Sequence, residues 1–397
     1  MELISFIDDI VGIILVLLIG VVVTLICAKA FLVPRRWALV LFIWHTFFSL
    51  VYAWVVINFM GDATMYYQEA QVGINEFHFG VTSVIFIANL IYKFLDLSFL
   101  GLGMFFSIFG VIGLLAFDAS LRHVTRDTTR NIKLLALIIV LLPSISYWSA
   151  GLGKDSISFM ATGLALWASL NLTKRKLLMV FAIASMLLVR PHIAGLMVVA
   201  LTFAVMVGKN MNMLQRIFFV SVALVTALLM VPFALDYAGL KDFSVQGLMS
   251  YIEKRQLYNW KGYGGGIDIS SMSLPMQMFT YLFRPLPFEA HSFFAFMASV
   301  DNVFLLYLFV MGLFAKIKGG FAHPNLNTMF IWIYGGIALL ALSTTTATNL
   351  GIAMRQKWMF LPFFIVLFVS YIAQRNRQKT LRHYQLKQNH ISQNLRH

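Results

Sequence analysis

Residues 10–33 read IVGIILVLLIGVVVTLICAKAFLV, an apolar stretch with a single charged residue, Lys29. A hydrocarbon core about 30 Å thick is crossed by roughly 20 apolar residues in an α-helix. The stretch therefore predicts a membrane-spanning helix. Because Glu2, Asp8 and Asp9 precede it in place of lysines, and no small-residue cleavage pattern follows, we interpret it as a retained helix and not as a signal peptide.

Comparable apolar stretches recur along the whole chain. Of its 397 residues, 60% are apolar and 12% are charged, which excludes a soluble globule and a disordered chain. A lone cysteine, Cys27, excludes a disulfide framework and a cysteine-based metal site. We predict an all-α, polytopic integral membrane helical bundle over residues 1–373 with about eleven transmembrane helices. The expected spans are 10–33, 38–60, 98–117, 133–150, 156–172, 177–189, 193–207, 217–235, 293–315, 328–347 and 359–373.

Clusters of Lys and Arg lie at alternate ends of these spans. If the acidic N-terminus is outside, the clusters around Arg35, Arg122 and Lys174 and the basic tail 374–397 are cytoplasmic, as the positive-inside rule requires. We therefore predict an N-out, C-in topology and a tail that is disordered or lies on the membrane surface. The net charge of +14 follows from this topology. Nucleic acid is not an expected partner, because the cations form short juxtamembrane clusters that face anionic lipid.

Two outer stretches depart from the simple pattern. Residues 81–94 are apolar but shorter than a span, and they predict a re-entrant or interfacial helix. Residues 236–292 form one long outer loop with Tyr258, Trp260 and a glycine-rich run at 262–266, which would suit a cover over a substrate. We find no internal repeat, which disfavours an inverted-repeat transporter.

Acidic residues follow the second span. Asp62, Tyr66 and Glu69 are spaced i, i+4 and i+7, so they would share one side of a helix. Asp62 is interpreted either as the N-cap of that helix or as a catalytic carboxylate, and the two roles are compatible.

Cations also occur at outer helix ends, against the positive-inside rule. Lys154 and Asp155 follow a short glycine turn, and a lysine beside a helix N-terminus suits a phosphate. The alternative is that both residues mark the membrane surface. The turn is too short for a nucleotide-binding P-loop. The outer cations, which together suit a polyanionic lipid head group, are Lys154, Arg190, Arg284, Arg355 and Lys357.

Arg190 and His192 lie at the head of a broken helix pair. The arginine suits either an anion or an interhelical ion pair, and the histidine either a base or a packing contact. The outer Asp, Glu and His residues lack metal-ligand spacing, so we expect no metal and no cofactor. Within the spans, Asp301 either makes a structural hydrogen bond or lines a cavity, and with His45 it provides too few ionisable groups for a proton-coupled transporter.

Four short motifs on the outer side carry a family resemblance. They are Gly-Asp-x-x-x-Tyr at 61–66, Gly-Leu-x-Lys-Asp at 151–155, Arg-Pro at 190–191 and Arg-x-Lys at 355–357. In this combination the chain resembles the Wzy/EpsG-type polysaccharide repeat-unit polymerases, among the GT-C-like membrane glycosyltransferases. The longer arginine-containing loop repeats described for some of these polymerases are not evident.

The resemblance implies a polymerase of the bacterial cytoplasmic membrane that joins undecaprenyl-diphosphate-linked oligosaccharide repeat units on the periplasmic or extracellular side, for an O-antigen, capsule or exopolysaccharide. Asp62 is the first candidate for the general base and His192 the second. The outer cations would bind the diphosphate. The remaining residues expected to bind substrate are Tyr66, Glu69, Asp155, Tyr258 and Trp260.

Expected partners are the lipid-linked glycans, membrane lipids, a chain-length regulator and a flippase. Three alternatives stay open. One is a glycosyltransferase with a polyprenyl-phosphate sugar donor, another is an enzyme like the O-antigen ligases, and the third is a lipid-linked glycan flippase or transporter.

Overall fold

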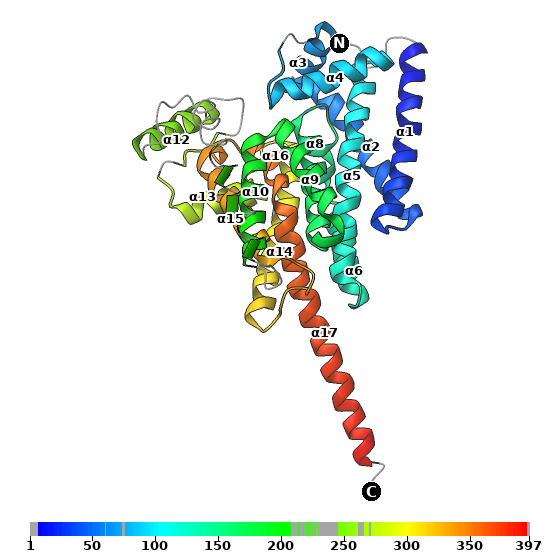
Figure 1. Cartoon of the computed structure of the whole chain (residues 1–397), viewed down its shortest axis with the longest axis vertical. Helices are drawn as coiled ribbons and strands as arrows, with labels where there is room; N and C mark the ends of the chain where they lie inside the picture. Colours follow the sequence, from blue (N-terminus) through cyan, green and yellow to red (C-terminus); the bar gives the residue numbers. More distant parts are fainter. Residues whose placement is uncertain are drawn as a thin grey trace.

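The computed structural model describes residues 7–59, 61–73, 76–207, 245–260, 266–269 and 271–394, with isolated helical positions between 213 and 228. In this part of the chain the regular structure is helical, apart from one isolated bridge between Gly266 and Asn349 (Figure 1). The described helices begin with α1 Ile7–Phe31, α2 Arg35–Phe59, α3 Asp62–Val72, α4 Val81–Leu95, α5 Phe99–Thr125, α6 Arg130–Val140, α7 Pro143–Ser149, α8 Lys154–Ser169, α9 Leu172–Val189 and α10 Pro191–Met206. They continue with α12 Val245–Trp260, α13 Leu274–Phe283, η1 Pro287–Glu289, α14 Phe293–Ile317, α15 Thr328–Thr346, α16 Leu350–Gln356, η2 Lys357–Met359 and α17 Leu361–Asn394.

The described helices include long apolar ones, as expected of a helical membrane protein. Six are long and apolar enough to cross a membrane. The pair Leu350–Met359 and Leu361–Gln388, bent by 64°, is either a seventh, broken span or a re-entrant loop. The six are Ile10–Phe31, Arg35–Phe59, Phe99–Thr125, Arg130–Ser149, Phe293–Ile317 and Thr328–Thr346. Helices α8 and α10 coincide with predicted spans but have only 16 residues each. Most of the predicted span 217–235 lies outside the described residues.

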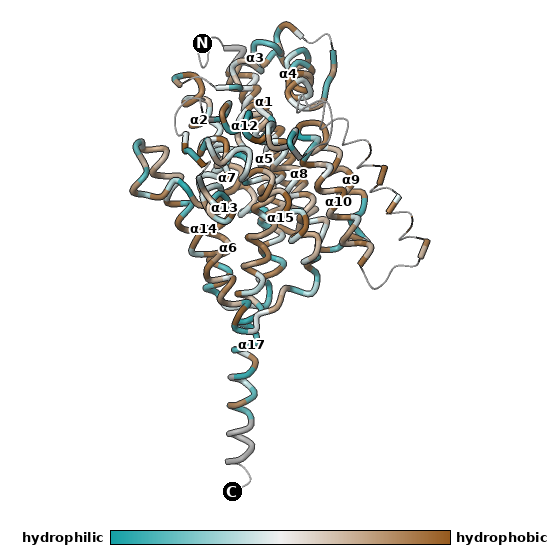
Figure 2. Tube along the Cα trace, turned by 90° about the vertical axis from the view of Figure 1, so that its left-hand side faces the viewer, coloured by the Kyte–Doolittle hydropathy of each residue, from teal (hydrophilic) through white to brown (hydrophobic). Residues whose placement is uncertain are grey.

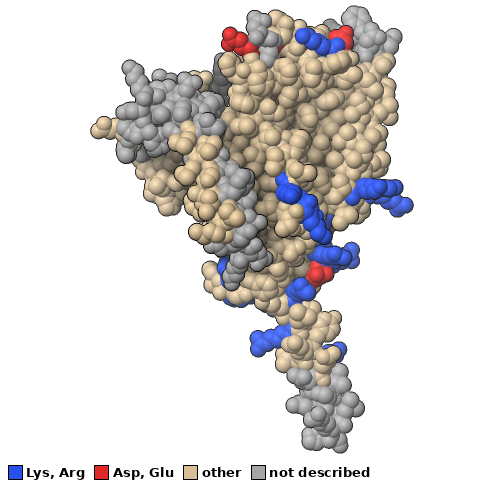
Figure 3. Space-filling view, viewed as in Figure 1, with Lys and Arg blue, Asp and Glu red and all other residues tan. Residues whose placement is uncertain are grey.

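The two ends of the bundle differ in what they carry. Helices α3 and α4 lie across the end at which α1 begins, and α17 leaves through the opposite end (Figure 1). We call these the α3 end and the α17 end. Hydrophobic residues predominate through the middle of the bundle in Figure 2. On the face shown in Figure 3, Asp and Glu lie mostly at the α3 end, and Lys and Arg lie mostly toward the α17 end.

The basic tail differs from its prediction. Residues 374–394 continue α17 as one helix that projects beyond the bundle (Figure 1), whereas we expected disorder or a surface position. The tail is rich in Gln, Lys, Arg and Leu and contains neither glycine nor proline. Residues of that kind favour helix propagation from an existing span.

Helices α5 and α8 form the buried centre of the bundle, and nearly every residue of both is buried. They approach closely because glycines face each other. A Cβ at Gly163 would lie 2.4 Å from the carbonyl oxygen of Gly113, and one at Gly113 would lie 2.7 Å from that of Phe159. Small residues at helix crossings allow this close backbone packing in membrane proteins.

Replacing Gly163 by alanine should therefore destabilise the protein by about 1–3 kcal/mol, because the added methyl group must push two helix backbones apart. The matched control is Gly103→Ala in α5, where a Cβ meets nothing within 4 Å. The control should be neutral or slightly stabilising, since alanine favours helix over glycine. Thermal unfolding in detergent measures both. Equal melting temperatures for the two variants would contradict the close crossing.

Candidate functional site

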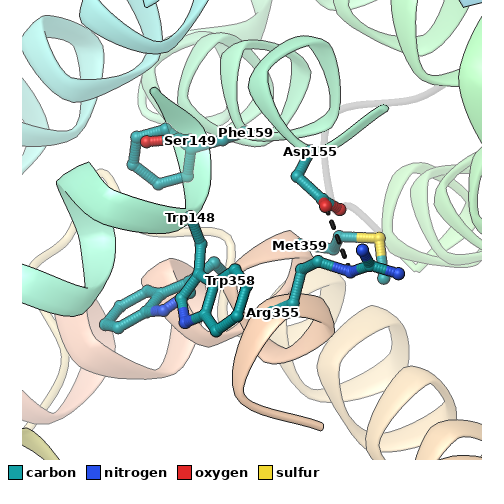
Figure 4. Close-up of a pocket in the computed structure, with 7 residues that line it drawn as sticks. All are labelled: Trp148, Ser149, Asp155, Phe159, Arg355, Trp358 and Met359. Carbon is teal, nitrogen blue, oxygen red and sulfur yellow. Dashed lines mark ion pairs between the residues drawn. The ribbon is translucent and has the colours of Figure 1, made fainter. Parts of the chain in front are cut away.

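Two arginines and two aspartates from distant parts of the sequence form a continuous set of ion pairs toward the α3 end. Asp155 Oδ1 lies 2.6 Å from Arg190 Nη2, and Asp155 Oδ2 lies 3.2 Å from Arg355 Nε. Asp62 Oδ2 lies 3.2 Å from Arg355 Nη1. Figure 4 shows Asp155 and Arg355 facing each other as an ion pair at the edge of a small pocket that both residues line. We call Asp62, Asp155, Arg190 and Arg355 the ion-pair cluster.

Local structure explains how Asp62 reaches this cluster. It is the first residue of α3, and the preceding Gly61 is the N-cap, whose carbonyl accepts a hydrogen bond of 2.8 Å from Thr64 Oγ1. Asp62 is thus not the N-cap. Its carboxylate remains 55% exposed while it contacts Arg355, so the cluster has one acid that solvent and substrate can reach.

Asp155 is positioned by the tight turn before α8. At Gly151, a Cβ would lie 2.1 Å from Cε1 of Tyr52, so the ring of Tyr52 fits against the turn only because this residue is glycine. The turn leads into the first turn of α8, where Asp155 lies. Here the negative side chain is favoured by the helix dipole as well as by Arg190 and Arg355.

Arg190 lies where α9 ends and α10 begins. Its backbone N–H closes α9 by donating to the carbonyl of Met186, and Pro191 starts α10. The arginine is only 5% exposed, and its Nε lacks a hydrogen-bond partner in the described part of the chain. Of the two interpretations of Arg190, the ion pair is present, and one buried donor remains for another acceptor.

Lys154 adds a third cation beside the cluster. It forms no ion pair among the described residues, and burial, followed by the charge of Arg190, lowers its pKa to about 8. With two arginines, one lysine and two carboxylates, the region has an excess of positive charge at neutral pH. Such an arrangement favours an anionic ligand.

Tyr66 and His192 border the same charges. Tyr66 is 4% exposed, and burial, followed by the nearby Asp62 carboxylate, raises the pKa of its phenol, which therefore stays protonated. For His192, the surrounding protein and the cations Arg190 and Lys154 lower the pKa, although the side chain is exposed at the surface. The imidazole is therefore neutral at pH 7, and the lowered pKa makes it a weaker base than an ordinary histidine.

Lys357, which we expected to bind substrate, lies elsewhere. It is 1% exposed, and its Nζ donates to Asn302 Oδ1 at 2.5 Å and to the carbonyl of Leu282 at 3.1 Å. Two residues along a helix are separated by roughly 200° of rotation. Arg355 and Lys357 consequently point in different directions, and only Arg355 joins the cluster.

Other predicted substrate-binding residues also lie outside the cluster. Arg284 pairs with Glu289 through Nη2–Oε1 at 2.6 Å and Nε–Oε2 at 3.1 Å. Glu69 is exposed and makes no ion pair within the described residues, and Tyr258 is 75% exposed on α12. The side chain of Trp260 and residues 262–265 of the glycine-rich run lie outside the described residues.

The long loop at 236–292 contains the helix α12, which packs on the end of α15. Gln256 Nε2 and Asn259 Nδ2 each donate at 2.8 Å, to the carbonyls of Thr344 and Thr345 respectively. Asn349, the N-cap of α16, donates to the carbonyl of Asn259 at 3.2 Å. Part of the loop is therefore attached to the short helix that carries Arg355. The sequence analysis did not identify Gln256, Asn259 and Asn349, because these amide residues form no recognisable sequence motif.

The pocket beside the cluster has aromatic walls (Figure 4). Its lining residues are Trp148, Ser149, Asp155, Phe159, Arg355, Trp358 and Met359. The indole Nε1 of Trp358 is buried and has no hydrogen-bond partner in the described part of the chain. The pocket has room for about one water molecule. Its aromatic rings beside the aspartate–arginine pair therefore offer an apolar and polar surface at the rim, and not an enclosed ligand cavity.

Tyr52 is a further residue of this region that the sequence analysis missed. It lies within electrostatic reach of Arg355, Asp155 and Asp62. Its ring packs against that of Tyr147 at a centroid distance of 5.6 Å. A single tyrosine in an apolar span gives no signal of its own, because its importance depends on the turn at Gly151 that packs against it.

Two adjacent residues of α14 form hydrogen bonds with the elements that carry the lining residues of the pocket. Asp301 Oδ2 accepts a hydrogen bond of 2.7 Å from the backbone N–H of Ser144 in the first turn of α7, the helix that ends near Trp148. Asn302 accepts from Lys357 in η2, next to Trp358, and donates to the carbonyl of Pro285 at 3.0 Å. Asp301 is thus a structural hydrogen-bonding group that caps α7 from another helix.

Within the described residues, no group of three or more His, Cys, Asp or Glu side chains is arranged to hold a metal ion. Comparison of the chain with family models, with curated proteins and with solved structures finds no match. The site must therefore be interpreted from its own chemistry.

Proposed function

We propose that this protein is a membrane glycosyltransferase that joins polyprenyl-diphosphate-linked oligosaccharide units into a polysaccharide. The observation that carries the proposal is the ion-pair cluster with Lys154 beside it, next to a pocket with tryptophan walls. A lipid diphosphate needs several cations, and the attacking hydroxyl needs a reachable base. Both requirements are met by residues that lie within one region.

In this reaction an acceptor hydroxyl attacks the anomeric carbon of the donor. The new bond joins that oxygen to the anomeric carbon, and the bond between the anomeric carbon and the diphosphate oxygen breaks. Asp62, the exposed acid of the cluster, takes the hydroxyl proton, and the leaving diphosphate takes the electron pair. Arg190, Arg355 and Lys154 stabilise its charge, while Asp155 orients both arginines.

The proposed topology has the N-terminus outside and the α3 end facing the periplasm or the extracellular space. It uses eleven spans. Three of them, α8, α9 and α10, are shorter than the others, and α8 is the one that is buried within the bundle. A further span is 217–235. The cations toward the α17 end then face the cytoplasm, in agreement with the positive-inside rule. The bacterial cytoplasmic membrane is the proposed location, with a flippase and a chain-length regulator as partners.

The test uses purified protein and a synthetic polyprenyl-diphosphate repeat unit without nucleotide sugars. Products spaced by whole repeat units are expected, and Asp62→Asn should abolish them. The matched control is Glu76→Gln, which changes an exposed acid in the segment after α3 and should retain the ladder. Extension by one sugar, a single transfer to a lipid A core, or lipid movement across vesicles without a new bond would each overturn the proposal.

A further inference from the structure

A groove on the outside of α1 lies far along the helix from the ion-pair cluster. Its lining residues are Val22, Leu25, Ile26, Lys29 and Arg35. The first four follow the spacing i, i+3, i+4 and i+7, so they form one stripe of α1, and Arg35 adds the first residue of α2. The groove is therefore apolar along its length and cationic at one end.

Helix α1 lies at the edge of the bundle, where it packs mainly against α2 and α5 (Figure 1). Val22 is 55% exposed and Ile26 is 63% exposed, so this stripe faces away from the protein core. Within a membrane, such a face contacts acyl chains. A groove offers a chain more contact than a smooth helix surface does.

The cationic end of the groove lacks neutralising carboxylates. Lys29 lies in the last turn of α1 and Arg35 begins α2, and neither forms an ion pair with a described residue. The two residues are held near each other by the tight connection between the helices, in which Val33 donates its N–H to the carbonyl of Ala28. They lie at the end of an apolar helix, which is where phosphate groups of a bilayer are found.

We infer that this groove is a binding site for one anionic diacyl phospholipid. The phosphate would lie between Lys29 and Arg35, and one acyl chain would lie along Val22, Leu25 and Ile26. The charge at the end of the groove selects an anionic head group over a zwitterionic one, and the apolar stripe selects a lipid over free phosphate. The site does not depend on the proposed function, because it is separate from the ion-pair cluster.

The test compares phosphatidylglycerol with phosphatidylcholine of the same acyl chains by native mass spectrometry of the full chain in detergent. The protein should retain one phosphatidylglycerol preferentially. The double variant Lys29→Gln, Arg35→Gln should weaken that binding by about tenfold or more, because both cations near the phosphate are lost. Both side chains are exposed, so the variant is expected to remain folded, and its melting temperature verifies this.

The matched control is Lys316→Gln, Lys318→Gln at the end of α14. These cations lie over aromatic rings, Lys316 at 5.2 Å from the centroid of Tyr371 and Lys318 at 4.1 Å from that of Phe314. The control should bind phosphatidylglycerol as the unchanged protein does. An equal loss in the control, or equal retention of the two lipids by the unchanged protein, would overturn the inference.

A second variant tests the apolar part of the groove. Ile26→Trp leaves both cations in place but fills the space for the acyl chain, and it should also weaken phosphatidylglycerol binding. Unchanged binding in Ile26→Trp would mean that the cations act without the groove, which would refute a lipid site of the kind inferred here.

Discussion

Replacing Arg190 by alanine is expected to lower the rate of glycan joining by about 100- to 1,000-fold, the typical loss when one preorganised donor is removed from a developing anion. The arginine is 5% exposed, and its Nε has no hydrogen-bond partner in the described part of the chain, so a donor is available where water is largely excluded. Single-turnover measurement of the first joining step with the polyprenyl-diphosphate substrate gives the rate of the chemical step.

The variant Arg190→Lys separates the effect of the positive charge on the rate from the effect of the guanidinium geometry. A lysine keeps the positive charge but cannot present two parallel donors, so we expect partial activity, between that of the alanine variant and that of the unchanged protein. The control is Arg377→Ala, whose arginine pairs with Asp127 at the α17 end and is 47% exposed. Arg377→Ala should leave the rate unchanged. An unchanged rate in a folded Arg190→Ala protein would remove this residue from the site.

Loss of Arg190 also removes one partner of Asp155, whose side chain is 17% exposed, and a half-buried carboxylate without its cation lowers stability. Arg355 still contacts Asp155 at 3.2 Å in this variant, so the carboxylate keeps one partner. The melting temperature in detergent should be measured beside the rate. A rate loss that accompanies a small stability loss is then assigned to catalysis, because the folded fraction is known.

The helical elements were predictable because lipid requires long apolar stretches. Residues 10–33 and 293–315 predicted helices that the structure has as α1 Ile7–Phe31 and α14 Phe293–Ile317. The helical tail was not predicted, because its polar composition suits both a helix that extends a span and a disordered segment. A hydropathy pattern indicates which segments contact lipid. It does not distinguish a helix from a disordered segment where the chain is polar and leaves the bundle.

The site was predictable only in part. Sequence reasoning placed five cations, Lys154, Arg190, Arg284, Arg355 and Lys357, beside a few carboxylates because all lie at helix ends on one side. The structure brings two of these cations, Arg190 and Arg355, into contact with Asp62 and Asp155. Sequence reasoning could not foresee that Arg284 pairs with Glu289, since the two meet through a local turn. The separation of Lys357 from the cluster follows from helical geometry, which turns residues two apart in different directions.

The hydrogen bonds of Lys357 show why a cation buried near a site need not bind substrate. A lysine that is 1% exposed is tolerated only where its donors are satisfied, here by Asn302 and by the carbonyl of Leu282. Asn302 is next to Asp301, which caps α7. The lysine therefore joins η2, α13 and α14, the elements behind the pocket.

Lys357→Met is accordingly expected to destabilise the protein by about 1–3 kcal/mol, because two buried acceptors lose their donor. The variant keeps most of the side-chain volume but leaves Asn302 Oδ1 without its donor. Unfolding free energies measured in mixed micelles would show the loss. The control Lys318→Met changes an exposed lysine and should alter stability by no more than about 0.5 kcal/mol.

A double-mutant cycle separates the hydrogen-bond network from simple loss of packing. Asn302→Leu alone should also destabilise, since Lys357 then loses an acceptor and the carbonyl of Pro285 loses a donor. Together with Lys357→Met, the combined loss should be smaller than the sum of the two single losses by about 0.5–3 kcal/mol, because the contact can be lost only once. Strictly additive losses would mean that the two residues stabilise the protein independently, and the network that we describe behind the pocket would then have no energetic basis.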